Sequence, residues 1–101
     1  MSFLALFFAG AFLANAIPHL TAGLLGMGFP TPFAKPRGIG FSSPLVNFIW
    51  GTVNLVVGLI LLDRHPVPGV FSPEAGAMLG GFLLLGLYCS HHFGKVRDGQ
   101  V

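Results

Sequence analysis

A few uncharged polar side chains interrupt the apolar stretches of this sequence. They are Asn15, His19, Asn47, Asn54 and Tyr88. Amide, imidazole and phenol groups exchange hydrogen bonds, and imidazole also exchanges protons near neutral pH. In hydrocarbon each such group needs a partner, because an unsatisfied polar group is costly there. We therefore expect these side chains to face other protein groups rather than lipid.

The positions of these groups along the expected helices predict a pocket. His19, Asn47 and Tyr88 each lie roughly 10 Å to one side of their helix midpoints, at about 1.5 Å per residue. Asn15 is one turn from His19 on the same face. We expect Asn15 to join the other three in one polar pocket, with Trp50 close by. The alternative for His19 is structural: it donates to a backbone carbonyl that the preceding proline leaves free.

The histidines also allow ligation of a cofactor. His19 and either His91 or His92 fall toward the same leaflet, so a haem or chlorin could bridge the first and third helices. Paired histidines at a helix end are commonly just solvated at the interface. The sequence has neither a C-x-x-C-H nor an H-E-x-x-H spacing. We expect no cofactor and no metal, with tetrapyrrole binding as the alternative.

Groups that could carry out catalysis are sparse. The acids are Asp63, Glu74 and Asp98, and all lie at expected helix ends or in the tail. Capping and surface roles explain acids at such places. No intramembrane Ser, His and Asp set, carboxylate pair or phosphate-binding loop accompanies them. The sequence therefore predicts a protein that is not an enzyme.

The composition identifies the environment of these groups. Of the 101 residues, 53% are hydrophobic and 8% are charged. A soluble domain uses charges for roughly a quarter of its residues, and a disordered chain has low hydrophobicity. We therefore expect an integral membrane protein whose first partner is the lipid bilayer. Nucleic acid is not expected as a partner, because the five basic residues form no clustered basic face.

Three apolar stretches are long enough for transmembrane helices, since a bilayer core of about 30 Å takes roughly 20 helical residues. The sequence predicts an all-α fold with one transmembrane domain over residues 1–101 and helices at about 3–29, 44–62 and 72–90. Pro18 is expected to kink the first helix, because proline removes a backbone donor. Ser43-Pro44 and Ser72-Pro73 are typical helix starts, in which serine caps free amides.

The basic residues predict an orientation. Lys35 and Arg37 lie between the first and second expected helices. Lys95 and Arg97 lie in the tail, whereas Arg64 alone lies on the other side. Cytoplasmic loops of bacterial membrane proteins carry the excess of Lys and Arg. We therefore expect the N-terminus outside and the C-terminus in the cytoplasm.

Small residues form a face on each expected helix. On the second helix, small and amide residues recur at spacings of four, three and four, at Asn47, Gly51, Asn54 and Gly58. The third helix carries Gly76-x-x-x-Gly80. Such faces let a neighbouring backbone approach closely, and hydrogen bonds across them contribute about 0.6 kcal/mol on average. Helix packing is the simplest interpretation, and two amides on one short helix also allow a functional role.

A longer pattern carries a resemblance to other proteins. Its segments are Asn15-x-x-Pro18-His19, Phe29-x-Thr31-Pro32-Phe33 and Ser43-Pro44-x-x-Asn47-x-x-Trp50-x-x-x-Asn54. Over roughly residues 10–60 the chain resembles a group of small multi-pass bacterial inner-membrane proteins. The resemblance implies a bacterial inner-membrane location and brings no activity with it.

These features together predict an accessory or assembly subunit of a larger membrane complex, for example a photosynthetic or respiratory one. Its partners would be other membrane-protein subunits or further copies of the chain. A first alternative is a homo-oligomeric channel or carrier for a small solute or ion, with Asn47, Asn54 and His19 along the pathway. A second alternative is the histidine-ligated haem or chlorin binder.

Overall fold

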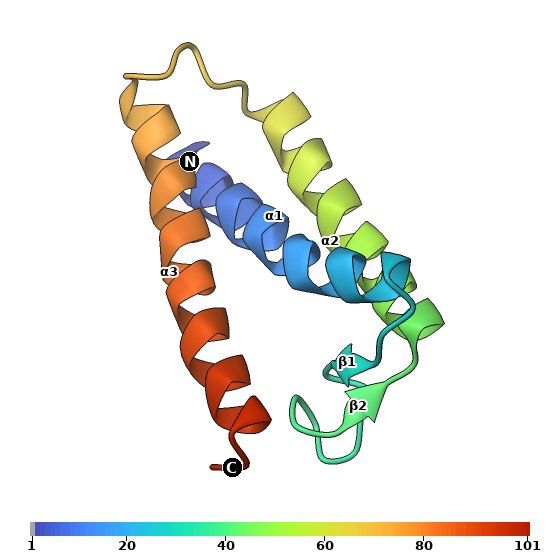
Figure 1. Ribbon diagram of the computed structural model, residues 1–101. Coiled ribbons are helices and arrows are strands. Elements are labelled where there is room, and N and C mark those ends of the chain that lie inside the picture. Colours follow the sequence, from blue (N-terminus) through green and yellow to red (C-terminus); the bar gives the residue numbers. More distant parts are fainter. Residues whose placement is uncertain (1) are drawn as a thin grey trace.

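Three α-helices and one very short β-ladder make up the protein. The computed structural model describes residues 2–101 (Figure 1). The elements in chain order are α1 (Ser2–Leu24), β1 (Phe29–Pro30), β2 (Phe41–Ser42), α2 (Pro44–Arg64) and α3 (Pro73–Arg97). The predicted all-helical class is confirmed, since β1 and β2 are strands of two residues each.

Helix α1 is the centre of the bundle. Helices α2 and α3 both pack along α1 and make few contacts with one another, and Figure 1 shows α1 between them. The start of α1 and the end of α3 lie at opposite ends of a molecule that is 41 Å long. Within residues 2–101, helices α2 and α3 therefore each leave a wide outer surface free of contacts with the rest of the protein.

Helices α1 and α2 are long and apolar enough to cross a membrane, with 23 and 21 residues. Within residues 2–101 no third helix meets the same criterion, although α3 has 25 residues. The last part of α3 is polar, which lowers its average hydropathy. Pro18 lies inside α1, which continues through it to Leu24, and the predicted kink stays a prediction.

The first helix ends at Leu24, earlier than the predicted Phe29. Gly26 has a φ of 71°, which is the left-handed conformation that glycine adopts without steric cost. The N–H of Met27 donates to the carbonyl of Ala22 at 2.8 Å, as in a Schellman motif. The helix therefore stops before the apolar stretch does, because glycine provides a helix end inside that stretch.

The predicted starts of α2 and α3 are confirmed. Ser43 Oγ accepts a hydrogen bond from the Val46 N–H at 3.1 Å, and Ser72 Oγ accepts one from the Ala75 N–H at 3.1 Å. A proline follows each serine at the start of the helix. Helix α3 extends beyond its apolar stretch to Arg97, where basic side chains suit the negative end of the helix dipole.

Glycines allow α1 to lie close to both neighbours. A Cβ on Gly81 would overlap the carbonyl of Phe7, and one on Gly10 would overlap the carbonyl of Met78. On the other side, a Cβ on Gly51 would lie 2.8 Å from the α1 backbone. Apart from Leu6, the buried apolar residues are alanines: Ala9, Ala14, Ala16, Ala22 and Ala34.

Candidate functional site

A buried polar cluster joins α1 to α2. His19 Nδ1 lies 2.8 Å from Asn47 Oδ1, and Asn15 Nδ2 donates to Asn54 Oδ1 at 3.0 Å. The exposed fractions are 2% for His19, 0% for Asn47 and 1% for Asn54. The buried residues of α2 are those of the predicted stripe, Asn47, Gly51, Asn54 and Gly58. The structure therefore brings the amides of α2 against the polar side chains of α1.

Asn47 also binds the segment that leads into α2. Its Nδ2 is shared among the carbonyls of Phe29 at 3.0 Å, Ser42 at 3.2 Å and Ser43 at 3.1 Å. The ladder brings these carbonyls together, because Phe29 of β1 pairs with Ser42 of β2. A flipped amide would place its oxygen against three carbonyl oxygens, so the orientation of Asn47 is determined. One side chain thus connects both helices and the ladder.

The bond to Asn47 determines the tautomer of His19. An amide oxygen only accepts, so His19 Nδ1 carries the proton and donates. In the neutral ring Nε2 is then a free acceptor. The partner of His19 is thus a side-chain amide and not a carbonyl freed by the preceding proline. Aromatic rings of Phe29, Trp50 and Phe93 surround the imidazole edge-on.

A cavity of about 120 Å³ opens beside this cluster. Its polar lining residues are Asn15, His19, Thr31, Trp50, Tyr88 and His92. Asn47, which we expected in the same pocket, lies outside the lining. The indole N–H of Trp50 is buried and has no hydrogen-bond partner within residues 2–101. The cavity has room for several water molecules and is smaller than the roughly 300–1,000 Å³ of pockets for drug-sized ligands.

The loop between β1 and β2 forms one side of this cavity, and two contacts that the sequence did not predict hold it there. His92 Nε2 donates to the carbonyl of Gly38 at 2.6 Å, because a carbonyl only accepts. Thr31 Oγ1 lies 2.6 Å from Ser42 Oγ. Of these residues, Thr31 lies in the segment that carries the resemblance, which is the one signal that the sequence offered for this part of the site. His91, the other histidine considered as a ligand, is exposed.

The remaining predicted residues lie around the same region. Tyr88 stacks on His92 with ring centroids 5.5 Å apart, and 60% of Tyr88 is exposed. Cys89 Sγ lies 3.8 Å from Asn15 Oδ1. Within residues 2–101, no three His, Cys, Asp or Glu side chains lie close enough to hold a metal ion. Binding of a haem or chlorin through His19 stays the alternative to the prediction of no cofactor.

No protein-family model, curated protein or solved structure matches the chain. The resemblance to small bacterial membrane proteins therefore stays a prediction as well.

The geometry of the polar cluster gives it two properties. Its amides hold α1, α2 and the ladder together, and the Trp50 indole N–H is a buried group without a hydrogen-bond partner among residues 2–101.

Proposed function

We propose that this chain is a non-enzymatic small membrane protein that acts as an accessory or assembly subunit of a larger membrane complex. The free outer face of α3 is the observation that carries this proposal. Of the two other helices, α3 packs closely on α1 and makes few contacts with α2, and Gly81 is its buried residue. A Cβ on Gly76 or on Gly80 would meet no other atom of residues 2–101 within 4 Å. A helix of another subunit can therefore approach the backbone of α3 closely along this pair.

The internal bonding of the amides favours docking over conduction. Asn54 accepts from Asn15 and donates to the carbonyl of Trp50 at 2.8 Å. Asn47 bonds to His19 and to the ladder. A pathway lined by these amides would require them to turn outward and to lose those bonds. Removing buried partners in this way costs about 1–3 kcal/mol for each group left unsatisfied.

In this proposal α1, α2 and α3 all span a bacterial inner membrane, with the N-terminus outside and the C-terminus in the cytoplasm. The basic residues of the β1–β2 loop lie at the same end of the molecule as Lys95 and Arg97, because His92 bonds to Gly38. Arg64, at the end of α2, lies at the other end. This distribution supports the orientation, since basic residues concentrate on the cytoplasmic side.

A reporter fused after Val101 tests the orientation in bacterial cells. We expect a green fluorescent protein fused there to fluoresce, because it matures in the cytoplasm, and alkaline phosphatase fused there to be inactive. The reciprocal pattern, an active phosphatase and a dark fluorescent protein, would contradict the proposed orientation.

Gly80→Leu is expected to reduce the recovery of the partner subunit about tenfold. The added side chain would occupy the face of α3 that the partner approaches, and it has open space within the protomer. Tagged wild type and variant are purified from the native membrane in a gentle detergent and compared by quantitative mass spectrometry. Gly69→Leu is the control, because a Cβ on Gly69 is equally free of contacts within residues 2–101, and Gly69 lies before α3 begins, away from the Gly76 and Gly80 pair.

Two outcomes would count against this function. Recovery of the wild type only as a lone monomer would contradict it, as would equal losses of the partner with the Gly80 and Gly69 variants. The visible absorption spectrum of the same preparation distinguishes the accessory subunit from the alternative of a cofactor binder. A tetrapyrrole band would support haem or chlorin binding instead.

A further inference from the structure

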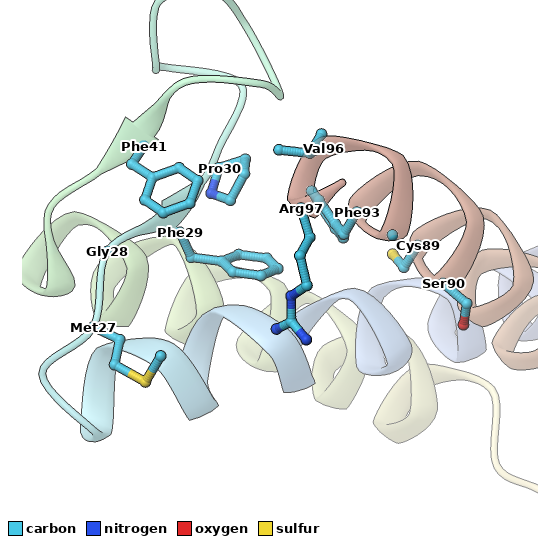
Figure 2. Close-up of a pocket in the computed structure, with 11 residues that line it drawn as sticks. Met27, Gly28, Phe29, Pro30, Phe41, Cys89, Ser90, Phe93, Val96 and Arg97 are labelled. Atoms are coloured by element: carbon cyan, nitrogen blue, oxygen red, sulfur yellow. The ribbon is translucent and has the colours of Figure 1, made fainter. Parts of the chain in front are cut away.

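Two adjoining cavities form one groove between α3 and the rest of the protein. The larger, about 470 Å³, lies between the end of α3 and the ladder (Figure 2). The second, about 350 Å³, lies between α1 and α3. Both are lined by Phe29, Cys89, Ser90 and Phe93. The groove extends along α3 from Arg97 to Phe82, a distance of about 22 Å at about 1.5 Å per residue.

The groove has apolar walls and one basic end. Met27, Phe41 and Val96 line the larger cavity, and Arg97 is the charged residue among the residues that line the two cavities. Figure 2 shows Arg97 extending from α3 into the space beneath the Phe29 ring. The basic residues of the β1–β2 loop lie at this same end of the molecule. Their combined positive potential attracts an anion to the mouth of the groove.

We propose that this groove binds one anionic phospholipid, with its phosphate on Arg97 and an acyl chain along α3 toward Phe82. Guanidinium and phosphate form charge-assisted, often bidentate hydrogen bonds. One leaflet of the hydrocarbon core is about 15 Å deep, half of about 30 Å, so the groove holds a chain over the full depth of a leaflet. Gly86 lines the groove, and a Cβ there would meet no other atom of residues 2–101 within 4 Å, so a larger side chain would extend into free space at the groove.

The cytoplasmic leaflet is the source of such a lipid. Anionic lipids give that leaflet a negative surface potential, which attracts basic groups next to the membrane. The site therefore depends on the membrane placement of the proposed function. It does not depend on docking at Gly76 and Gly80, which lie outside the lining of both cavities.

Native mass spectrometry of the purified full chain in a neutral detergent tests the head-group contact. With phosphatidylglycerol and phosphatidylcholine at equal concentrations, we expect about tenfold more of the phosphatidylglycerol adduct. Arg97→Gln is expected to reduce that adduct about tenfold. Lys95→Gln removes the same charge from the same helix end without changing the groove lining, so the adduct should stay within about twofold.

The head-group assignment is overturned by either of two results. Equal adducts of the two lipids would show that the site does not recognise the anionic head group. Equal losses in the Arg97 and Lys95 variants would show diffuse attraction to a basic surface. Circular dichroism of each variant checks that the helices are intact. A loss of adduct then reflects a change at the lipid site and not a loss of folding.

Gly86→Leu tests the acyl-chain part of the groove. The leucine would fill the groove away from Arg97, so we expect about tenfold less phosphatidylglycerol adduct with Arg97 unchanged. Inorganic phosphate at the same concentration is expected to give no retained adduct, because it lacks the chain. Retained phosphate, or an unchanged lipid adduct in Gly86→Leu, would overturn the lipid groove. Neither of these results bears on the recovery of the partner subunit with Gly80→Leu. The lipid proposal and the docking proposal can therefore fail independently of one another.

Discussion

Replacing Asn47 with leucine is expected to lower the free energy of unfolding by about 3 kcal/mol. The variant loses the bond to His19 and the bonds to three carbonyls at the entry to α2. The Asn47 side chain is fully buried, and so is the His19 ring that would lose its partner, with 2% of its surface exposed. Unfolding is followed by circular dichroism in mixed micelles with a rising fraction of a denaturing detergent.

Asn54→Leu is the matched control for this prediction. Asn54 lies on the same helix and is also buried, with 1% of its surface exposed. It makes one side-chain bond to α1, from Asn15 at 3.0 Å, and its other bond is to the carbonyl of Trp50 in its own helix. We expect a loss of about 1 kcal/mol. Equal losses in the two variants would contradict the central role of Asn47.

Nitrogen NMR of the imidazole gives a readout that general destabilisation does not mimic. In the wild type His19 should show a protonated Nδ1 and an unprotonated Nε2, because Nδ1 donates to Asn47. In a folded Asn47 variant this preference is expected to disappear. A wild-type ring with the proton on Nε2 would contradict the hydrogen-bond arrangement.

Local sequence patterns predicted the parts of the fold that depend on local physics. The stripe that contains Asn47 and Asn54 follows helical periodicity, and its residues are the buried residues of α2. The caps of Ser43 and Ser72 depend on a serine followed by proline. The end of α1 was predicted too late, because apolarity does not register the left-handed conformation of Gly26.

The candidate site was predictable only in outline. Depth along the helices placed Asn15, His19 and Tyr88 near one another, and all three line one cavity. The partners of Asn47 in the ladder were not predictable, since they are backbone carbonyls of a segment whose path depends on tertiary contacts. The bond between His92 and Gly38 was missed for the same reason.

Helix rotation is a further property that the sequence left open, and it leads to the second large prediction. Gly80 and Gly81 are adjacent, and either could belong to a small-residue packing face. In the structure Gly81 lies against the carbonyl of Phe7, whereas Gly80 lies in open space. Replacing each glycine with alanine is therefore expected to change the free energy of unfolding in opposite directions.

Gly81→Ala is expected to lower the free energy of unfolding by about 3 kcal/mol. The new methyl group would overlap the Phe7 carbonyl, and a backbone atom moves only if α1 and α3 separate. Gly80→Ala is expected to raise the free energy of unfolding by about 0.5–1 kcal/mol, because alanine favours a helix more than glycine does. Both values come from the same detergent titration.

The reverse result, a destabilising Gly80→Ala and a neutral Gly81→Ala, would mean that α3 is rotated relative to α1 and that Gly80 faces the core. If Gly81→Ala destabilises the protein and Gly80→Ala does not, the two glycines have different roles. Gly81 sets the distance between α3 and α1 within the protomer. Gly80 is free to be changed without loss of stability, so a reduced recovery of the partner with a larger residue there reports docking and not unfolding.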